Sequence, residues 1–213
     1  MTEDEWLAAT DPVLMLEGVR GKVSDRKLRL LAVACCRRIL SVMPHDAHRT
    51  AVGVAERFAD CLETDDERDF WYQEAHEVCW DVPGDRADLH HAARAACDAV
   101  DVRVTDPLPY LPVICQSDRF VEEAERRAQK ELIHDIFGPL PLRTVPFDSA
   151  WRTSTVLALA TGIYQDRAFE RLPFLADALQ DAGCDNEDVL THCRSDGPHF
   201  RGCWVVDLVL GKE

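Results

Sequence analysis

The feature that most constrains this fold is a long apolar stripe with helical spacing between residues 24 and 43. Ser24 is suited to cap the start of a helix, and Pro44 follows its expected end. Between them, apolar side chains recur every three or four residues, which is the repeat of a helix with one buried face. The stripe consists of Leu28, Leu31, Ala32, Cys35, Ile39, Val42 and Met43. We therefore predict a core helix over residues 24–43.

Helix signals of the same kind recur along the rest of the 213 residues. Thr2 with Glu5, and Thr64 with Glu67, have the spacing of capping boxes, in which each side chain bonds the other's backbone. The β-branched residues fall mostly inside helical stripes, so no segment is convincing as a strand. The sequence predicts an all-α protein, an irregular multi-helix bundle of about eight helices.

A proline-rich stretch interrupts the helical pattern near the middle of the chain. Pro107, Pro109 and Pro112 remove backbone donors and restrict the residues before them. We expect a stiff connector at residues 106–117, between an N-lobe at 1–105 and a C-lobe at 118–213. Both lobes would belong to a single domain.

The charge and the cysteine usage limit the partners and the compartment. The net charge is −15, and such an acidic surface repels phosphate backbones, so nucleic acid is an unlikely ligand on electrostatic grounds. No apolar run approaches the roughly 20 residues of a membrane span, and the acidic N-terminus is unlike a signal peptide. Nine cysteines without any Cys-x-x-Cys pair indicate reduced thiols in the cytoplasm.

The basic residues of the predicted helix over residues 24–43 lie away from its apolar stripe. Arg26, Arg29 and Arg37 share this part of the chain, whereas the residues that follow are strongly acidic. We predict that part of this basic face pairs with acids of the same chain rather than with an external anion.

Two sequence blocks resemble a known family. The first runs from Trp6-Leu7-Ala8 through Arg26-Lys27-Leu28-Arg29-Leu30 to Ala34-Cys35-Cys36-Arg37-Arg38-Ile39. The second begins at Ala150-Trp151-Arg152-Thr153 and includes Ala176-Asp177-Ala178-Leu179, Ala182-Gly183-Cys184, His192-Cys193-Arg194, Gly197-Pro198-His199 and Arg201-Gly202-Cys203-Trp204-Val205-Val206-Asp207. Together they are similar to a family of uncharacterised bacterial proteins. The resemblance implies a bacterial cytoplasmic protein, but no activity, cofactor or site residue.

The second block contains side chains of zinc-binding types. In a helix over residues 185–194, Cys184 and Cys193 would be about 13 Å apart along the axis, too far to share one ion. His192 and Cys193 are neighbours and point about 100° apart. Cys193, His199 and Cys203 remain as candidate ligands, with a fourth needed from elsewhere. The alternative is that no cofactor is bound, the cysteines are small core residues and the histidines form hydrogen bonds.

No motif assigns a catalytic residue. Cys193, His199 and Asp207 have the residue types of a thiol nucleophile, its base and an orienting acid, but not the pattern of a known enzyme class. The function expected from the sequence is therefore a non-enzymatic helical module that binds an unidentified protein partner. The alternative is a metal- or thiol-dependent site in the C-terminal block, structural or enzymatic.

Aromatic side chains mark the expected partner surface. Phe70, Trp71 and Tyr72 are consecutive, so a helix cannot turn all three toward one core, and Trp80 follows on the same segment. Aromatic residues often anchor protein partners. The alternative is a wide core beneath neighbouring helices.

Overall fold

The structure, a computed structural model, describes residues 1–82, 87–101, 119–139 and 141–212. These residues form eleven α-helices and four short 3-10 helices, and none of them lies in a β-strand. The prediction of an all-α protein is confirmed. The expected number of about eight helices was too low, and the eleven include short ones such as α1 (Glu3–Ala8).

The chain divides into two compact units, which we call unit 1 (Met1–Ile133) and unit 2 (His134–Glu213). The division falls within helix α8 (Arg119–Phe137), whose last turn belongs to unit 2. The connector expected at residues 106–117 lies outside the described residues.

Unit 1 begins with six helices whose starts are fixed by local hydrogen bonds. They are α1, α2 (Pro12–Val19), α3 (Asp25–Arg38), α4 (Asp46–Ala59), α5 (Asp65–Glu77) and α6 (Ala87–Val100), with the 3-10 helices η1 (Leu40–Val42) and η2 (Val78–Asp81). Thr2 and Glu5 form the predicted capping box, and the Thr64 hydroxyl accepts a hydrogen bond from the Glu67 amide. Helix α3 ends at Arg38 rather than at residue 43, because the chain tightens into η1.

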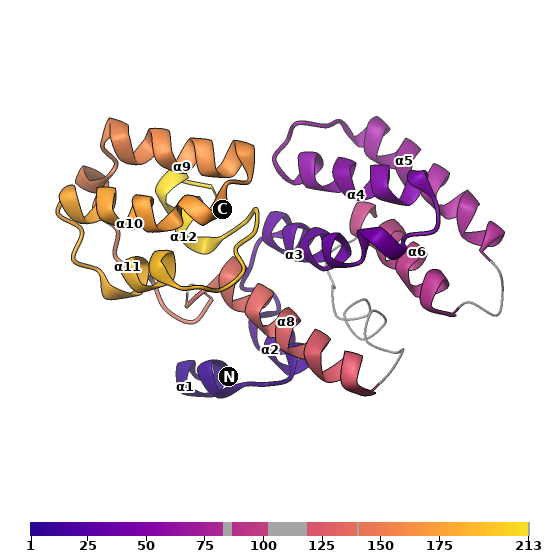
Figure 1. The fold of residues 1–213 in the computed structure, drawn as a ribbon, viewed down its shortest axis with the longest axis horizontal. Coiled ribbons are helices and arrows are strands. Elements are labelled where there is room, and N and C mark those ends of the chain that lie inside the picture. The colour runs from indigo at the N-terminus through magenta and orange to yellow at the C-terminus, as the bar shows by residue number, and fades with distance from the viewer. Residues whose placement is uncertain (83–86, 102–118, 140, 213) are drawn as a thin grey trace. The chain divides into compact units, whose positions relative to one another are not determined.

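Helix α4 lies at the centre of unit 1 and packs against α3, α5 and α6 (Figure 1). Leu31 and Cys35 of α3 are fully buried, as predicted, whereas Ile39 is half-buried at the edge of the core. The buried alanines of α6, including Ala92 and Ala96, allow neighbouring helices to approach closely. The core of this unit therefore combines large side chains on α3 with small ones on α6.

The basic face of α3 is satisfied within the chain. Arg26 pairs with Asp60 at 3.0 Å, and Arg37 pairs with Glu56 at 2.6 Å. Arg29 donates instead to the backbone carbonyl groups of Ala99 and Asp101. The predicted pairing with intramolecular acids is confirmed for two of the three arginines.

Unit 2 contains four helices after the last turn of α8. They are α9 (Ser154–Asp166), α10 (Leu172–Asp181), α11 (Glu187–Arg194) and α12 (Trp204–Leu210), with the 3-10 helices η3 (Ser149–Trp151) and η4 (Phe169–Arg171). Helix α12, yellow in Figure 1, packs against α9, and α10 packs against both α9 and α11. Leucines of α10 and valines of α12 meet in the core, including Leu172, Leu175, Leu179, Val205, Val206 and Val209.

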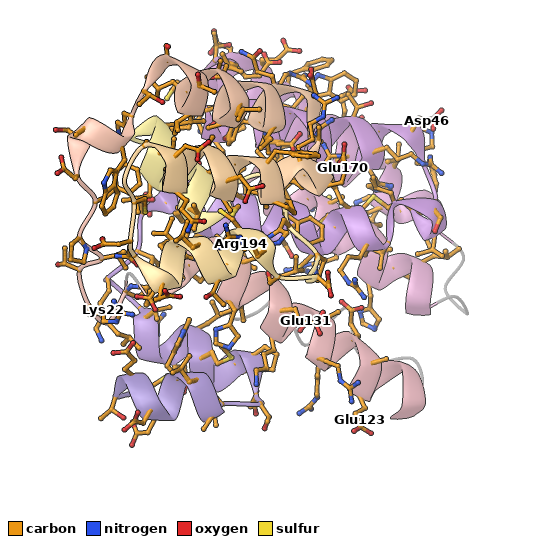
Figure 2. The ribbon with its side chains drawn as sticks, turned by 60° about the vertical axis from the view of Figure 1, so that its left-hand side comes forward. Lys22, Asp46, Glu123, Glu131, Glu170 and Arg194 are labelled. Carbon is orange, nitrogen blue, oxygen red and sulfur yellow. The ribbon has the colours of Figure 1, made fainter. Side chains whose placement is uncertain are left out.

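Charged side chains lie at the surface of both units. Asp46, Glu123 and Glu170, labelled in Figure 2, are exposed. Among the described helices, none combines the length and the apolar character that crossing a membrane requires.

Candidate metal centre

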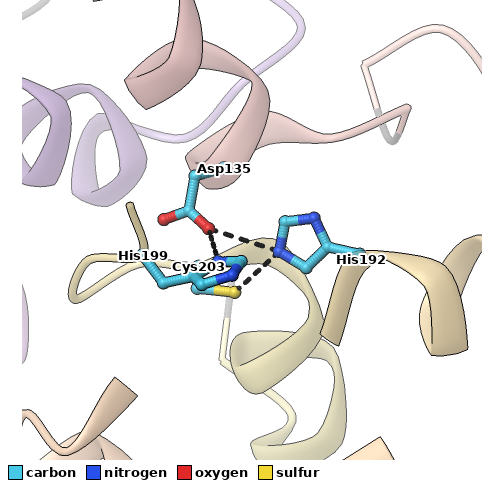
Figure 3. A group of neighbouring side chains, drawn as sticks. All are labelled: Asp135, His192, His199 and Cys203. Carbon is cyan, nitrogen blue, oxygen red and sulfur yellow. Dashed lines mark hydrogen bonds and ion pairs between the residues drawn. The ribbon is translucent and has the colours of Figure 1, made fainter. Parts of the chain in front are cut away.

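Four side chains of metal-binding types converge within unit 2 (Figure 3). Asp135 comes from the last turn of α8 and His192 from α11, while His199 and Cys203 lie on the segment before α12. One carboxylate oxygen, two imidazole nitrogens and one sulfur all lie within 4.8 Å of one another. The cluster therefore joins the end of α8 to two neighbouring segments that follow more than 50 residues later.

Helix α11 presents His192 at the edge of the core. The Asn186 side chain accepts hydrogen bonds from the amides of Asp188 and Val189 and so fixes the start of this helix. Val189, Leu190 and Cys193 turn into the core, and each residue is rotated about 100° from the next. His192 consequently leaves the core side of the helix, and its side chain is 15% exposed.

A turn brings His199 and Cys203 to the same place. The Cys203 amide donates to the Phe200 carbonyl at 2.9 Å, and Gly202 has a φ of +97°, a value that favours glycine. Cys203 then precedes the first residue of α12, and its carbonyl accepts from the Asp207 amide. The start of α12 thereby fixes the position of the Cys203 sulfur, which is fully buried.

A close approach between α8 and α12 brings Asp135 toward the other three ligands. Gly138 follows the end of α8 with a φ of +53°. A Cβ atom at this position would lie 2.6 Å from carbons of the Trp204 ring. Trp204 directly follows Cys203. The absence of a side chain at Gly138 therefore allows the end of α8, which contains Asp135, to lie close to Cys203.

The individual distances show that two imidazole nitrogens surround one carboxylate oxygen. Asp135 Oδ1 lies 2.6 Å from His199 Nδ1 and 3.2 Å from His192 Nε2. His192 Nε2 also lies 3.1 Å from Cys203 Sγ. The three contacts link His199 through Asp135 and His192 to Cys203, as the dashed lines in Figure 3 show.

Further contacts orient the same side chains from outside. Asp135 Oδ2 accepts a hydrogen bond from the Phe200 amide at 2.8 Å, which leaves Oδ1 facing the cluster. His199 Nε2 lies 3.4 Å from the Ser195 carbonyl oxygen, which acts solely as an acceptor. The 2.6 Å contact between His199 Nδ1 and Asp135 Oδ1 requires a proton between these atoms in the metal-free protein, so Nδ1 would present a lone pair inward only when a cation takes that proton's place.

The electrostatics of the cluster follow from its burial. Burial by itself would raise the pKa of Asp135, but hydrogen bonds and charge from His192 and His199 hold it below its usual value. Burial would lower the pKa of His199, but the hydrogen bond with Asp135 raises it. Burial, followed by the charge of Asp135, raises the pKa of the Cys203 thiol well above its usual value. In the absence of a cation, the buried thiol is therefore neutral.

The structure brings together two of the three ligands predicted from the sequence. His199 and Cys203 belong to the cluster, whereas Cys193 is 0% exposed in the core and is not one of its four ligands. His192 and Cys193 point apart, as predicted, but His192 rather than the predicted Cys193 joins the cluster. The apolar positions Val189 and Leu190 continue to Cys193 with helical spacing, and this signal would have assigned Cys193 to the core.

Asp135 was missed altogether in the sequence. It stands in the run Leu132-Ile133-His134-Asp135-Ile136-Phe137, where the neighbouring apolar side chains are buried. An acid among buried apolar residues is unusual and indicates a specific partner. Such a signal identifies the residue but not its partners.

The other predicted sites have different surroundings. Phe70 on α5 and Trp80 on η2 are 53% and 81% exposed, whereas Trp71 and Tyr72 pack partly against the core of unit 1. Asp207, the acid of the considered thiol set, is buried in α12. Cys193 is also buried, and burial raises the pKa of its thiol to about 12. Burial of the thiol and a raised pKa are both unfavourable for a nucleophilic cysteine.

Comparison of the chain with protein-family models, with curated protein sequences and with solved structures finds no match. The resemblance to a bacterial family therefore stays a prediction. The chemistry of the chain has to be inferred from its own geometry.

Proposed function

We propose that unit 2 is a zinc-stabilised helical module in which one structural zinc ion is bound by Asp135, His192, His199 and Cys203. The observation that carries the proposal is the convergence of four ligand atoms from three segments within 4.8 Å. Zinc is usually bound by four ligands of the types Cys, His and Asp.

The ligand types favour zinc over other common cations. Calcium and magnesium prefer sites made of oxygen ligands alone, whereas this set contains two imidazoles and a thiol. Imidazole and thiolate ligands suit zinc and related transition metals. The single carboxylate is compatible with this preference, because aspartate is also a ligand of zinc.

The observed distances are close to those of a tetrahedral site. With bonds of about 2.0–2.3 Å, neighbouring ligands of one zinc ion lie roughly 3.3–3.7 Å apart. The measured contacts of 2.6, 3.1 and 3.2 Å are shorter by less than about 1 Å. Without a metal, a proton must separate His199 Nδ1 from the carboxylate, and a cation would replace that proton.

The outer hydrogen bonds are those expected around a metal. Ligating histidines commonly donate their second nitrogen to a carbonyl or carboxylate, which fixes the ring and its tautomer. The Ser195 carbonyl is suitably located for His199, and the Phe200 amide engages the second oxygen of Asp135. Both contacts leave the inner atoms of these ligands directed at the proposed ion.

A structural role is favoured over a catalytic one. Catalytic zinc sites usually have three protein ligands and an open position, whereas here four side chains would supply all the ligands of a tetrahedral ion. Asp135 and Cys203 are almost fully buried, and the side chains of His192 and His199 are only 15% and 7% exposed. Substrate access to the ion would thus be restricted.

The first experiment measures metal content in protein purified without chelator. We expect about one zinc per chain, retained in Cys193→Ala and lost in Cys203→Ala. The two variants are matched, because both remove a thiol that is 0% exposed in the same core. Loss of zinc from Cys193→Ala with retention in Cys203→Ala would contradict the proposed ligand set. Absence of metal from the wild type after refolding with zinc would exclude the site.

The second experiment tests the structural role by calorimetry with and without chelator. Zinc binding contributes about 2.7 kcal/mol to stability when free zinc is 100 times its Kd. For a unit of roughly 80 residues this corresponds to a rise in melting temperature of about 10–20 °C. We expect the transition of unit 2 to shift by this amount and that of unit 1 to remain unchanged. A shift of less than about 2 °C would argue against the structural role.

A second candidate function concerns unit 1, and the exposure of two large aromatic residues favours it. Phe70 and Trp80, at 53% and 81% exposed, are suited to anchor an unidentified cytoplasmic protein. Comparative pull-downs would use the wild type and a Phe70→Ser/Trp80→Ser double variant, with Leu157→Ser on unit 2 as the control. A partner retained equally by all three proteins would contradict this candidate.

A further inference from the structure

A second cluster of reactive side chains lies in unit 1, away from the metal centre in the sequence. Cys79 on η2, Cys97 on α6 and His48 on α4 have ligand atoms within 4.8 Å of one another. The sulfur atoms of Cys79 and Cys97 are 3.5 Å apart, and Cys79 Sγ lies 3.6 Å from His48 Nε2. Both cysteines are free thiols. The cluster thus contains a pair of thiols in contact and one imidazole beside them.

The hydrogen bonds of His48 indicate which of its ring nitrogens carries a proton. His48 Nε2 lies 3.1 Å from the Ala75 carbonyl oxygen, and a carbonyl oxygen accepts but does not donate. Nε2 therefore carries a proton, and its lone pair is not available to a metal ion. The other nitrogen, Nδ1, is buried without a hydrogen-bond partner among the described residues. This arrangement favours thiol chemistry over metal binding.

The two thiols differ in accessibility. Cys97 is 3% exposed, whereas Cys79 is partly exposed. The hydrogen bond with Cys97, together with the hydrogen bond and charge of His48, lowers the pKa of Cys79 to about 5, although burial acts in the opposite direction. The contact with Cys79 and burial raise the pKa of Cys97. Cys79 is consequently the more acidic and the more accessible thiol of the pair, and in its protonated form it donates to the Ala75 carbonyl.

We propose that Cys79 and Cys97 form a reversible intramolecular disulfide on reaction with hydrogen peroxide, with Cys79 reacting first. The sulfur atoms need to approach by about 1.5 Å to reach the length of a disulfide bond. No other side chain needs to contribute a thiol. The pair constitutes a peroxide-sensitive modification site.

The reaction balances with these groups alone. The Cys79 thiolate attacks one peroxide oxygen, the O–O bond breaks, and the released hydroxide takes up a proton to give water and a sulfenic acid. The Cys97 sulfur then attacks the Cys79 sulfur, the S–O bond breaks, and the Cys97 proton leaves with the hydroxide as a second water. Two thiols are oxidised by two electrons, and one peroxide is reduced to two waters.

The test treats the reduced full-length chain with one equivalent of hydrogen peroxide at pH 6 and maps its peptides without reductant. We expect a loss of two thiols per chain and a Cys79–Cys97 disulfide, reversed by dithiothreitol. Cys61 is exposed and serves as the internal control. Cys79 should react before Cys61, because its contacts with Cys97 and His48 favour its thiolate. Preferential oxidation of Cys61, with Cys79 and Cys97 still reduced, overturns the proposal.

Two variants separate the two steps. Cys97→Ser should accumulate a sulfenic acid on Cys79, trapped by dimedone, whereas Cys61→Ser should form the disulfide as the wild type does. Absence of the dimedone adduct from a folded Cys97→Ser protein, verified by circular dichroism, would show that Cys79 is not the attacking thiol. If zinc or copper added alone protects both thiols from alkylation until chelator is supplied, the cluster is a metal site and the redox proposal fails.

Discussion

The replacement Gly138→Ala tests the close approach between α8 and α12. Gly138 has a φ of +53°, and a Cβ atom would meet carbons of the Trp204 ring at 2.6 Å. The left-handed backbone costs a residue with a Cβ about 1–2 kcal/mol. Overpacking of a rigid ring adds about 1–3 kcal/mol. We therefore expect the free energy of unfolding of unit 2 to fall by about 2–5 kcal/mol.

Gly211→Ala provides the matched control for this measurement. Gly211 also follows a helix of unit 2 and has a φ of +67°, but a Cβ atom there would meet nothing within 4 Å. Its replacement should cost only the backbone contribution of about 1–2 kcal/mol. Urea denaturation followed by circular dichroism gives both values. If the two variants lose the same stability within about 0.5 kcal/mol, the contact with Trp204 does not constrain α8 and the argument is refuted.

Three further predictions concern unit 1. Leu31→Ala should lower the free energy of unfolding by about 2–5 kcal/mol, because Leu31 is fully buried, and a loss below about 1 kcal/mol would contradict its core position. Burial raises the pKa of the Asp98 carboxyl group to about 6. The protonated carboxyl group therefore favours the folded state, and its contribution to the free energy of unfolding is lost as the pH rises toward and through 6. Relative to Asp98→Asn, the wild type should lose about 1 kcal/mol between pH 5 and pH 8, and parallel pH profiles would refute this. Arg37→Ala should cost about 2–4 kcal/mol by denaturation, because it removes a charge partner at 2.6 Å from the buried Glu56 carboxylate. Arg49→Ala, in an exposed pair, should cost less than about 1 kcal/mol, and equal losses would count against the distinction.

The helices were predictable because their signals are local. Thr2 and Thr64 lie three residues before their glutamates, and the stripe containing Leu31 repeats within a single helix. The end of α3 was less predictable, because the tightening into η1 is a property of the backbone rather than of the stripe. Patterns among residues a few positions apart thus predicted the fold class, but not the end of every helix.

The candidate sites were only partly predictable because they depend on tertiary packing. His199 and Cys203 are four residues apart and were recognised together, whereas Asp135 approaches them from α8, more than 50 residues earlier. Cys79 and Cys97 are separated by 18 residues and lack the Cys-x-x-Cys spacing that indicates a thiol pair. In both clusters, the packing of helices brings the side chains together, and no local sequence pattern predicts this packing.

The position of Trp204 gives the proposed metal centre an intrinsic optical signal. Its buried indole lies with the ring centroid 5.2 Å from that of His192. Excited indole is quenched by a nearby protonated imidazole or by a paramagnetic cation, and both effects require such short separations. The fluorescence lifetime of Trp204 should therefore distinguish the protonated cluster, the zinc-loaded cluster and a cobalt-substituted one without an added label.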